Sequence, residues 1–378
     1  MSTVALRGCL VFAVAAGVSG CGSGAASTNV ENEPSKGSDA STVRSFRFDY
    51  GATVSGIEAG KKVRVWLPLP TSDDHQTVRE VLRKLPAEAG DSIQENVEPE
   101  NGNTILYFEM TAPASGTIDL DMAWDVERRE AAGLKKPDGS PKPLTDEQRA
   151  KFVAANRRVP VGHAKPLGLI ARAKLPEDPL DLGKALYDTV DEHMRYDKPA
   201  DTPGWGNGDS VWACDSGFGN CTDFHSLFIS LARSQGLPAR FEIGFPLPAK
   251  TGDGPSEGPV GGYHCWAYFH VADHGWVPVD ISEADKDPTL KTYYFGNLTA
   301  NRIAFTNGRD IQLVPRQEGE PLNYFVYPYI EVDGKPLSGD QIKPRFAYKG
   351  NCGMKMGGTT TGTRQWTIFA PAFGVNKG

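Results

Sequence analysis

The stretch "GFGNCTDFHSLFISLARSQGLPAR", residues 217–240, places a cysteine at the start of an amphipathic helix. Asn220 can cap this helix, and Asp223, three residues later, can complete a capping box with it. The Gly-Leu-Pro near the end of the stretch ends the helix. The apolar stripe consists of Phe224, Leu227, Phe228 and Leu231. Cys221 therefore lies in the first turn, where free backbone N–H groups and the helix dipole favour a thiolate and can receive an oxyanion.

A second stretch, "GGYHCWAYFHVADHGWVPVDISEA" at 261–284, predicts a strand, a turn and a strand. His264 lies on the first strand and Asp280 at the end of the second. A two-residue turn would point the Asp280 carboxylate away from His264. A three-residue loop at 272–274, or a bulge beside it, instead pairs Trp266 with Asp280 and makes His264 and Asp280 diagonal neighbours on one face. We predict this second register.

The order of these motifs resembles the transglutaminase-like superfamily, which has a papain-type Cys-His-Asp triad. The likeness is carried by "GNCTDF", "YHCW" and "GWVPVD" over about 180–285, and "VWLPLP" and "NYFVYPYIEVDGK" resemble the flanks of a bacterial exported lipoprotein subgroup. The resemblance implies that Cys221 is the nucleophile, His264 the general base and acid, and Asp280 the group that orients the imidazole. Cys265 departs from the family, which more often has Ala there; we expect it on the strand face opposite His264, where it should not disturb the triad.

Other roles for these residues remain open. A disulfide is the main alternative for Cys221, because exported proteins often oxidise their cysteines, and Cys214 with Cys352 is the bridge we expect. His225, one turn after the nucleophile, is a rival base, but so close a helical neighbour is poorly placed to deliver a proton to a leaving group. The candidates for a second oxyanion donor are Tyr196, Trp205 and Trp212.

The chemistry implied is acyl transfer on peptide or carboxamide substrates through a thioester at Cys221, with hydrolysis favoured over protein cross-linking. A non-catalytic envelope binding module is the alternative from another class. We expect no cofactor and no metal: His270 and His274 have the spacing of a solvated hairpin end. The expected partner is a protein or peptide substrate in the cell envelope, and the oligomeric state is left open.

The start of the chain resembles an export signal. Residues 1–20 carry one charge, Arg7, and most of the apolar run "CLVFAVAAGVSGC". The sequence Val-Ser-Gly-Cys ending at Cys21 resembles a lipobox, so we expect an acylated Cys21, a flexible tether over 21–42, and a protein anchored by lipid in the bacterial cell envelope, at the outer membrane or facing the periplasm if the cell has two membranes. A net charge of −7 without a long basic run argues against nucleic-acid binding.

The rest of the chain predicts an α+β protein in three parts. Period-two patterns indicate a β-sandwich-like domain at 43–134, in which only "DDHQTVREVLRKL" at 73–85 has helical spacing. A Pro- and Gly-rich break precedes a transglutaminase-like, papain-like core at 143–290, with helices in 144–159 and 178–196 followed by a long Gly-rich loop up to Asn220. Residues 291–378 are expected to form a β-rich C-terminal extension.

Overall fold

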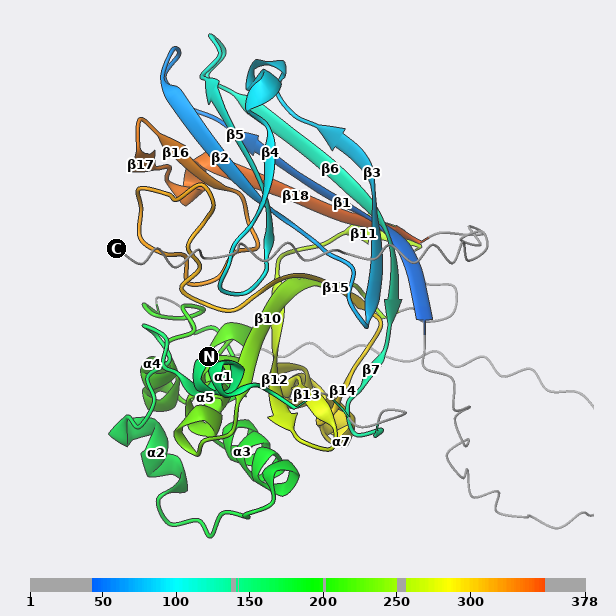
Figure 1. Ribbon diagram of the computed structural model, residues 1–378, viewed down its shortest axis with the longest axis vertical. Helices are drawn as coiled ribbons and strands as arrows, with labels where there is room; N and C mark the ends of the chain where they lie inside the picture. The colour runs from blue at the N-terminus through cyan, green and yellow to red at the C-terminus, as the bar shows by residue number, and fades with distance from the viewer. Residues whose placement is uncertain (1–42, 137–140, 142, 200–201, 250–255, 351–378) are drawn as a thin grey trace, which may run out of the picture. The chain divides into compact units, whose positions relative to one another are not determined.

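The computed structural model describes residues 43–136, 141, 143–199, 202–249 and 256–350 (Figure 1). The predicted signal peptide, the acylation site at Cys21, the tether up to residue 42 and Cys352 fall outside these ranges. No helix within the described ranges is both long enough and apolar enough to cross a membrane.

Two five-stranded antiparallel sheets form the β-sandwich, with strand order β11-β18-β1-β6-β3 in one and β17-β16-β2-β5-β4 in the other (Figure 1). The strands of the first sheet are β11 (Glu257–Pro259), β18 (Ile342–Gly350), β1 (Val43–Val54), β6 (Ile118–Arg129) and β3 (Gln76–Lys84). Those of the second are β17 (Lys335–Pro336), β16 (Tyr329–Val332), β2 (Lys62–Leu69), β5 (Thr104–Thr111) and β4 (Gln94–Val97). Alternate residues of β1, such as Phe46, Phe48 and Tyr50, are buried, because successive side chains of a strand face opposite sides.

Strands from the C-terminal part of the chain complete both sheets. β18 pairs with β1, which places Tyr348 opposite Phe48, and β16 pairs with β2, which places Ile330 opposite Val65. The period-two pattern of these late strands indicates an extended backbone and does not identify the partner strand. The sequence therefore predicts a β-rich C-terminal extension, but it does not predict that the strands of this extension pair with β1 and β2 in the sandwich.

The prediction of a helix in 73–85 is wrong, because this stretch forms strand β3, which pairs with β6. The register shifts between Glu80 and Leu82, so one residue is inserted relative to the partner strand. After such a bulge, the side chains that face inward are shifted by one position along the strand. Apolar residues three or four positions apart in the sequence can then belong to an edge strand as well as to a helix. Pairing with β6 overrides the local pattern.

A four-stranded sheet and seven helices surround the candidate site within the described residues. The sheet has the order β13 (Gly275–Val279), β12 (His264–Val271), β10 (Ala239–Pro246) and β15 (Arg302–Asn307). The helices are α1 (Asp146–Val153), α2 (Ala164–Ile170), α3 (Pro179–His193), α4 (Ser210–Ser216), α5 (Cys221–Ser234), α6 (Ile281–Lys286) and α7 (Lys291–Tyr294). α5 packs on the sheet, where Phe228 meets Phe269 of β12 with ring centroids 6.1 Å apart.

Short elements join these parts. Two-stranded pairings connect β7 (Ala131–Ala132) with β14 (Asn297–Leu298) and β8 (Arg195–Tyr196) with β9 (Phe218–Gly219), and 3-10 turns occupy Ala87–Ser92, Pro288–Leu290 and Gly339–Gln341. The Gly-rich loop predicted up to Asn220 is interrupted by α4, which Asp209 caps and Gly217 ends with φ +69°. A helix of seven residues has too few turns to show a clear apolar period, so it was missed.

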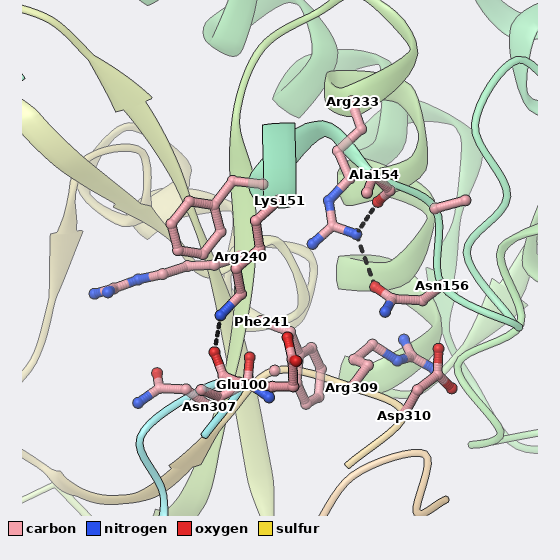
Figure 2. A pocket seen from close by; sticks show the side chains of 14 residues that line it. Glu100, Lys151, Ala154, Asn156, Arg233, Arg240, Phe241, Asn307, Arg309 and Asp310 are labelled. Carbon is pink, nitrogen blue, oxygen red and sulfur yellow. Dashed lines mark hydrogen bonds between the residues drawn. The ribbon is translucent and has the colours of Figure 1, made fainter. Parts of the chain in front are cut away.

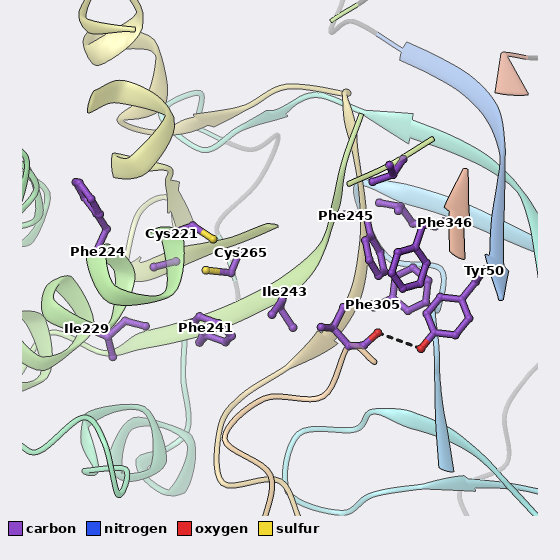
Figure 3. Packing of buried hydrophobic residues seen from close by; sticks show 14 of the residues in the cluster. Tyr50, Cys221, Phe224, Ile229, Phe241, Ile243, Phe245, Cys265, Phe305 and Phe346 are labelled. Atoms are coloured by element: carbon purple, nitrogen blue, oxygen red, sulfur yellow. Dashed lines mark hydrogen bonds between the residues drawn. The ribbon is translucent and has the colours of Figure 1, made fainter. Parts of the chain in front are cut away.

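An aromatic cluster joins the sandwich to the four-stranded sheet (Figure 3). Phe245 of β10 lies at its centre, with ring centroids 5.1 Å from Phe48 of β1, 4.3 Å from Phe346 of β18 and 5.2 Å from Phe305 of β15. The hydroxyl of Tyr50 at its edge donates to the carbonyl of Val326 at 3.1 Å. The sandwich and the sheet therefore share one continuous hydrophobic core.

Candidate active site

The start of α5 is capped as the sequence predicts. The Asn220 side chain accepts the Thr222 N–H at 2.9 Å, and the Asp223 carboxylate accepts the Asn220 N–H at 3.0 Å, so the capping box is complete. Cys221 is the first helical residue, is 2% exposed and has a free thiol. The structure thus shows no disulfide at this cysteine. Cys214 also has a free thiol, so the structure does not bear out the expected bridge from Cys214 to Cys352, whose second cysteine lies outside the described residues.

Asp223 also fixes the Gly-rich loop against the helix start. Its two oxygens accept the N–H groups of Gly206 at 2.8 Å and Gly208 at 2.9 Å. Gly206 has φ +74°, and a Cβ at this position would lie 2.9 Å from Nδ2 of Asn220, so the loop requires glycine there. Burial raises the pKa of the Asp223 carboxyl to about 6, although its three backbone donors act in the opposite direction.

The strand register that brings the histidine to the aspartate is confirmed. β12 and β13 pair with Ala267 opposite Val279 and Val271 opposite Gly275, which leaves a three-residue loop at 272–274. Asp280 follows directly and caps α6. Nε2 of His264 lies 2.8 Å from Oδ2 of Asp280, and both side chains are buried.

Asp280 is held as an anion by further donors. Arg302 donates to Oδ2 at 2.9 Å, while the Ser282 hydroxyl and the Glu283 N–H donate to Oδ1 at 3.1 and 3.3 Å. Burial opposes ionisation, but His264 and Arg302 outweigh it and hold the pKa of Asp280 well below its usual range. The role of Arg302 was not expected from the sequence, because it comes from β15, 22 residues further along the chain.

The thiol of Cys221 and the imidazole of His264 shift each other's pKa in opposite directions. Burial raises the pKa of the thiol, but hydrogen bonds from Cys265 and His264 and the charge of His264 bring it well below its usual value. Burial lowers the pKa of His264, and the stronger effects of Asp280 and Cys221 raise it above the ordinary range. These shifts favour a thiolate–imidazolium pair.

His225, the rival base, is used elsewhere. Its Nε2 accepts the Ile281 N–H at 3.1 Å, and its Nδ1 faces the Cys265 sulfur at 3.6 Å. The side chain is fully buried, and burial lowers its pKa to about 4. His225 is therefore a neutral imidazole at neutral pH.

Cys265 requires a correction, because it was expected to leave the site undisturbed. Its sulfur instead points toward that of Cys221 (Figure 3), and each thiol shifts the pKa of the other. The face of β12 that carries Cys265 also carries Phe269, which packs on α5. Since Cys221 begins α5, the strand face covered by this helix is the face that meets Cys221.

The three candidates for a second oxyanion donor fare differently. The indole N–H of Trp205 donates to the Asp197 carbonyl at 2.7 Å, so it is already engaged. The ring of Trp212 packs on Phe218, with centroids 5.7 Å apart. Tyr196 is 36% exposed, and both burial and the charge of Cys221 raise the pKa of its phenol, to about 12. Of the three, Tyr196 retains a hydroxyl whose titration senses the nucleophile.

Tyrosines beside the site were missed in the sequence. The Tyr263 hydroxyl accepts from Nδ2 of Asn220 at 3.1 Å and lies 3.4 Å from the hydroxyl of Tyr324. Burial is the main cause that raises the pKa of both phenols, and the charge of Cys221 contributes. Tyr324 belongs to the segment between β15 and β16, whose motifs were left without an assigned role.

A separate cavity of about 480 Å³ has Lys151, Arg233, Arg240 and Arg309 in its wall together with acidic, amide and apolar residues, and its lining includes none of Cys221, His264 and Asp280 (Figure 2). At its wall, Nη1 of Arg233 donates to the Ala154 carbonyl and to Oδ1 of Asn156, both at 2.7 Å. These bonds tie α5 to the end of α1. Among the described residues, no group of three or more His, Cys, Asp or Glu side chains is arranged to hold a metal ion.

Comparisons with known proteins agree with this geometry. Residues 170–281 match the model of the Transglutaminase-like superfamily. A protein of Haemophilus influenzae named only as uncharacterized is 29% identical over 360 residues, which cover 85% of this chain and 93% of the relative. The crystal structure of a candidate cysteine protease from Cytophaga hutchinsonii has a TM-score of 0.52 at 13% identity, covering 83% of this chain and 95% of that one, a likeness of fold. Residues 170–281, which include Cys221, His264 and Asp280, are thus similar to the transglutaminase-like superfamily.

Proposed function

We propose that the protein is a cysteine-dependent enzyme that attacks the carbonyl of a peptide or carboxamide and forms a thioester at Cys221. The observation that carries this proposal is the buried chain of contacts from the Cys221 thiol to His264 and from His264 to Asp280. The similarity of residues 170–281 to the transglutaminase-like superfamily supports the same class of reaction.

The geometry supports a division of roles in the reaction. Because Nε2 of His264 is held by Asp280, its Nδ1 is left to exchange protons with the thiol and the substrate. The Cys221 thiolate adds to the carbonyl carbon, and the oxyanion that forms is placed near the N–H groups of the first turn of α5. The protonated His264 then gives its proton to the leaving amine, and the C–N bond breaks.

The second half of the reaction distinguishes a hydrolase from a transferase. If water attacks the thioester, His264 accepts its proton, the C–S bond breaks and a carboxylic acid leaves. We propose hydrolysis as the main reaction, as the family resemblance implies. An amine in place of water would give a cross-linked product, so a glutamine-containing peptide with a labelled amine tests this choice: incorporation of the label would contradict a purely hydrolytic enzyme.

A binding module that uses the same cleft without chemistry is the remaining alternative. The assay incubates the protein with an extract of envelope proteins and measures the released peptides by mass spectrometry. We expect Cys221→Ala to release none. Cys214→Ala is the matched control, because this cysteine is also free and buried but lies on α4 and not on α5, β12 or the start of α6. Equal peptide release by Cys221→Ala and the wild type would refute the proposal.

We also propose that the protein is exported and anchored in the cell envelope by a lipid at Cys21, where it meets its protein or peptide substrate. The support is the lipobox-like sequence ending at this cysteine. The test is labelling of growing cells with a fatty-acid analogue. We expect label in the wild-type protein and none in Cys21→Ala; label in both would contradict anchoring at this residue.

A further inference from the structure

A line of contacts runs through two buried side chains and ends at the Cys221 sulfur. The Ile281 N–H donates to Nε2 of His225 at 3.1 Å, Nδ1 of His225 faces the Cys265 sulfur at 3.6 Å, and the Cys265 sulfur points toward that of Cys221 (Figure 3). His225 and Cys265 are both 0% exposed. Neither side chain has a part in the triad itself.

The backbone sets the direction of this line. A backbone N–H can only donate, so Nε2 of His225 must be the unprotonated nitrogen of the ring. A neutral imidazole then carries its proton on Nδ1, and burial keeps His225 neutral by lowering its pKa to about 4. The Cys265 sulfur therefore accepts from Nδ1–H, and its own proton is free to point onward.

We propose that Cys265, oriented by His225, is a positioning residue that donates its S–H to the Cys221 sulfur and stabilises the thiolate. This role rests on the proposed function of Cys221 as a nucleophile. A thiolate buried away from water needs donors, because desolvation of an unpaired charge is costly. Cys265 supplies one such donor in addition to His264, and it remains a thiol because its own pKa is raised well above the usual value by burial and by the negative charge of Cys221.

Other groups also face the Cys221 sulfur and contribute to its titration. They come from β8, α5, β12, α6, the residue before β12 and the segment between β15 and β16. The groups whose titration senses Cys221 are Tyr196, Asp223, His225, Tyr263, His264, Cys265, Lys286, Tyr324 and Tyr327. Of these, His264 and Cys265 are the two whose side chains lower the pKa of the Cys221 thiol by hydrogen bonding, so removing Cys265 isolates one of these two contributions.

The test is the pH dependence of alkylation of Cys221 by iodoacetamide under reducing conditions, followed by mass spectrometry of the peptide that contains this residue. We expect Cys265→Ala to raise the midpoint by about one pH unit, which is the effect of one hydrogen bond to a charged group. Cys265→Ser keeps a donor at this position and should stay within about 0.3 unit of the wild type on the same reasoning. Cys214→Ala should leave the midpoint unchanged.

The comparison of Cys265→Ser with Cys265→Ala shows whether Cys265 acts as a hydrogen-bond donor or only fills space. Ala and Ser are both smaller than Cys, so a packing role would make Cys265→Ser behave as Cys265→Ala. Equal midpoints in these two variants, or a wild-type midpoint in Cys265→Ala, would overturn the proposal. The proposed function fails separately: it fails if the wild-type protein shows a low alkylation midpoint but Cys221→Ala leaves substrate turnover intact. Circular dichroism of each variant before alkylation checks that it is folded.

Discussion

Replacement of Asp280 by Asn tests the triad most directly. The carboxylate accepts four hydrogen bonds, from His264, Arg302, the Ser282 hydroxyl and the Glu283 N–H. An amide keeps the size of the side chain but removes the negative charge that holds the imidazolium. In a Cys-His-Asp triad this change is expected to reduce kcat by roughly 10³- to 10⁴-fold. The amide no longer fixes the imidazole in the tautomer that the reaction needs, and it no longer balances the charge of the imidazolium.

The pH dependence of kcat in Asp280→Asn shows in which direction the loss of the carboxylate moves the pH limits of activity. In the wild type, the pKa of His264 is raised and that of Cys221 is lowered, so the active ion pair exists between the two. Without the carboxylate, the pKa of His264 should fall, because the imidazolium loses its charge partner. The alkaline limit of the active pH range should therefore move down, whereas the acid limit, which is set by the thiol beside a protonated His264, should not rise. The assay is kcat measured from pH 4 to 10, with alkylation of Cys221 followed in parallel.

Stability needs a separate measurement, because the substitution also leaves Arg302 without its buried partner. Breaking a buried ion pair on one side costs about 3–5 kcal/mol. The folded-state pKa of Asp280 is depressed, so its stabilisation is present above the unfolded pKa of about 3.9 and is lost as the pH falls through the lower folded value. The matched control is Asp178→Asn, which keeps the cap of α3. A folded Asp280→Asn with kcat within tenfold of the wild type and an unchanged profile would refute the triad.

Three further substitutions test the surroundings of the site. Gly206→Ala should destabilise the protein by more than the 1–2 kcal/mol that the left-handed backbone costs, because its Cβ would meet Asn220; Gly162→Ala, which has φ +75° and open space, gives the backbone cost alone in urea unfolding. Phe245→Ala should cost about 3–5 kcal/mol and keep a single thermal transition by fluorescence and circular dichroism; loss of the four-stranded sheet alone would contradict a shared core. His225→Gln retains one acceptor and one donor, so its alkylation midpoint should shift less than that of His225→Ala; equal shifts would contradict orientation by hydrogen bonding.

Local chemistry made the centre of the site predictable. The capping box of Asn220 and Asp223 determines where α5 begins, and that start places Cys221 in the first turn. The requirement that His264 and Asp280 share a face was enough to select the three-residue loop between their strands. In both cases the decisive interactions join residues that are close in sequence.

Long-range packing was not predictable in the same way. The bulge in β3 is set by its partner strand, and the contact of Cys265 with Cys221 depends on which face of β12 the helix covers. Arg302 and Tyr324 reach the site from segments whose own sequences carry no motif for it. Residue spacing along one segment does not contain this information, because it is determined by tertiary pairing.

The late strands of the sandwich have a consequence for the synthesis of the protein. When the ribosome has released residues up to the end of α7, the nucleophile, the histidine and the aspartate have all been made, but β15 with Arg302 has not. Neither has β18, which lies between β11 and β1 and supplies Phe346. A nascent or truncated chain that stops before Ile342 leaves the edge of β1 open. The surroundings of Cys221 are therefore complete only after translation has passed β15 and the segment with Tyr324 and Tyr327, and the sandwich only after β18.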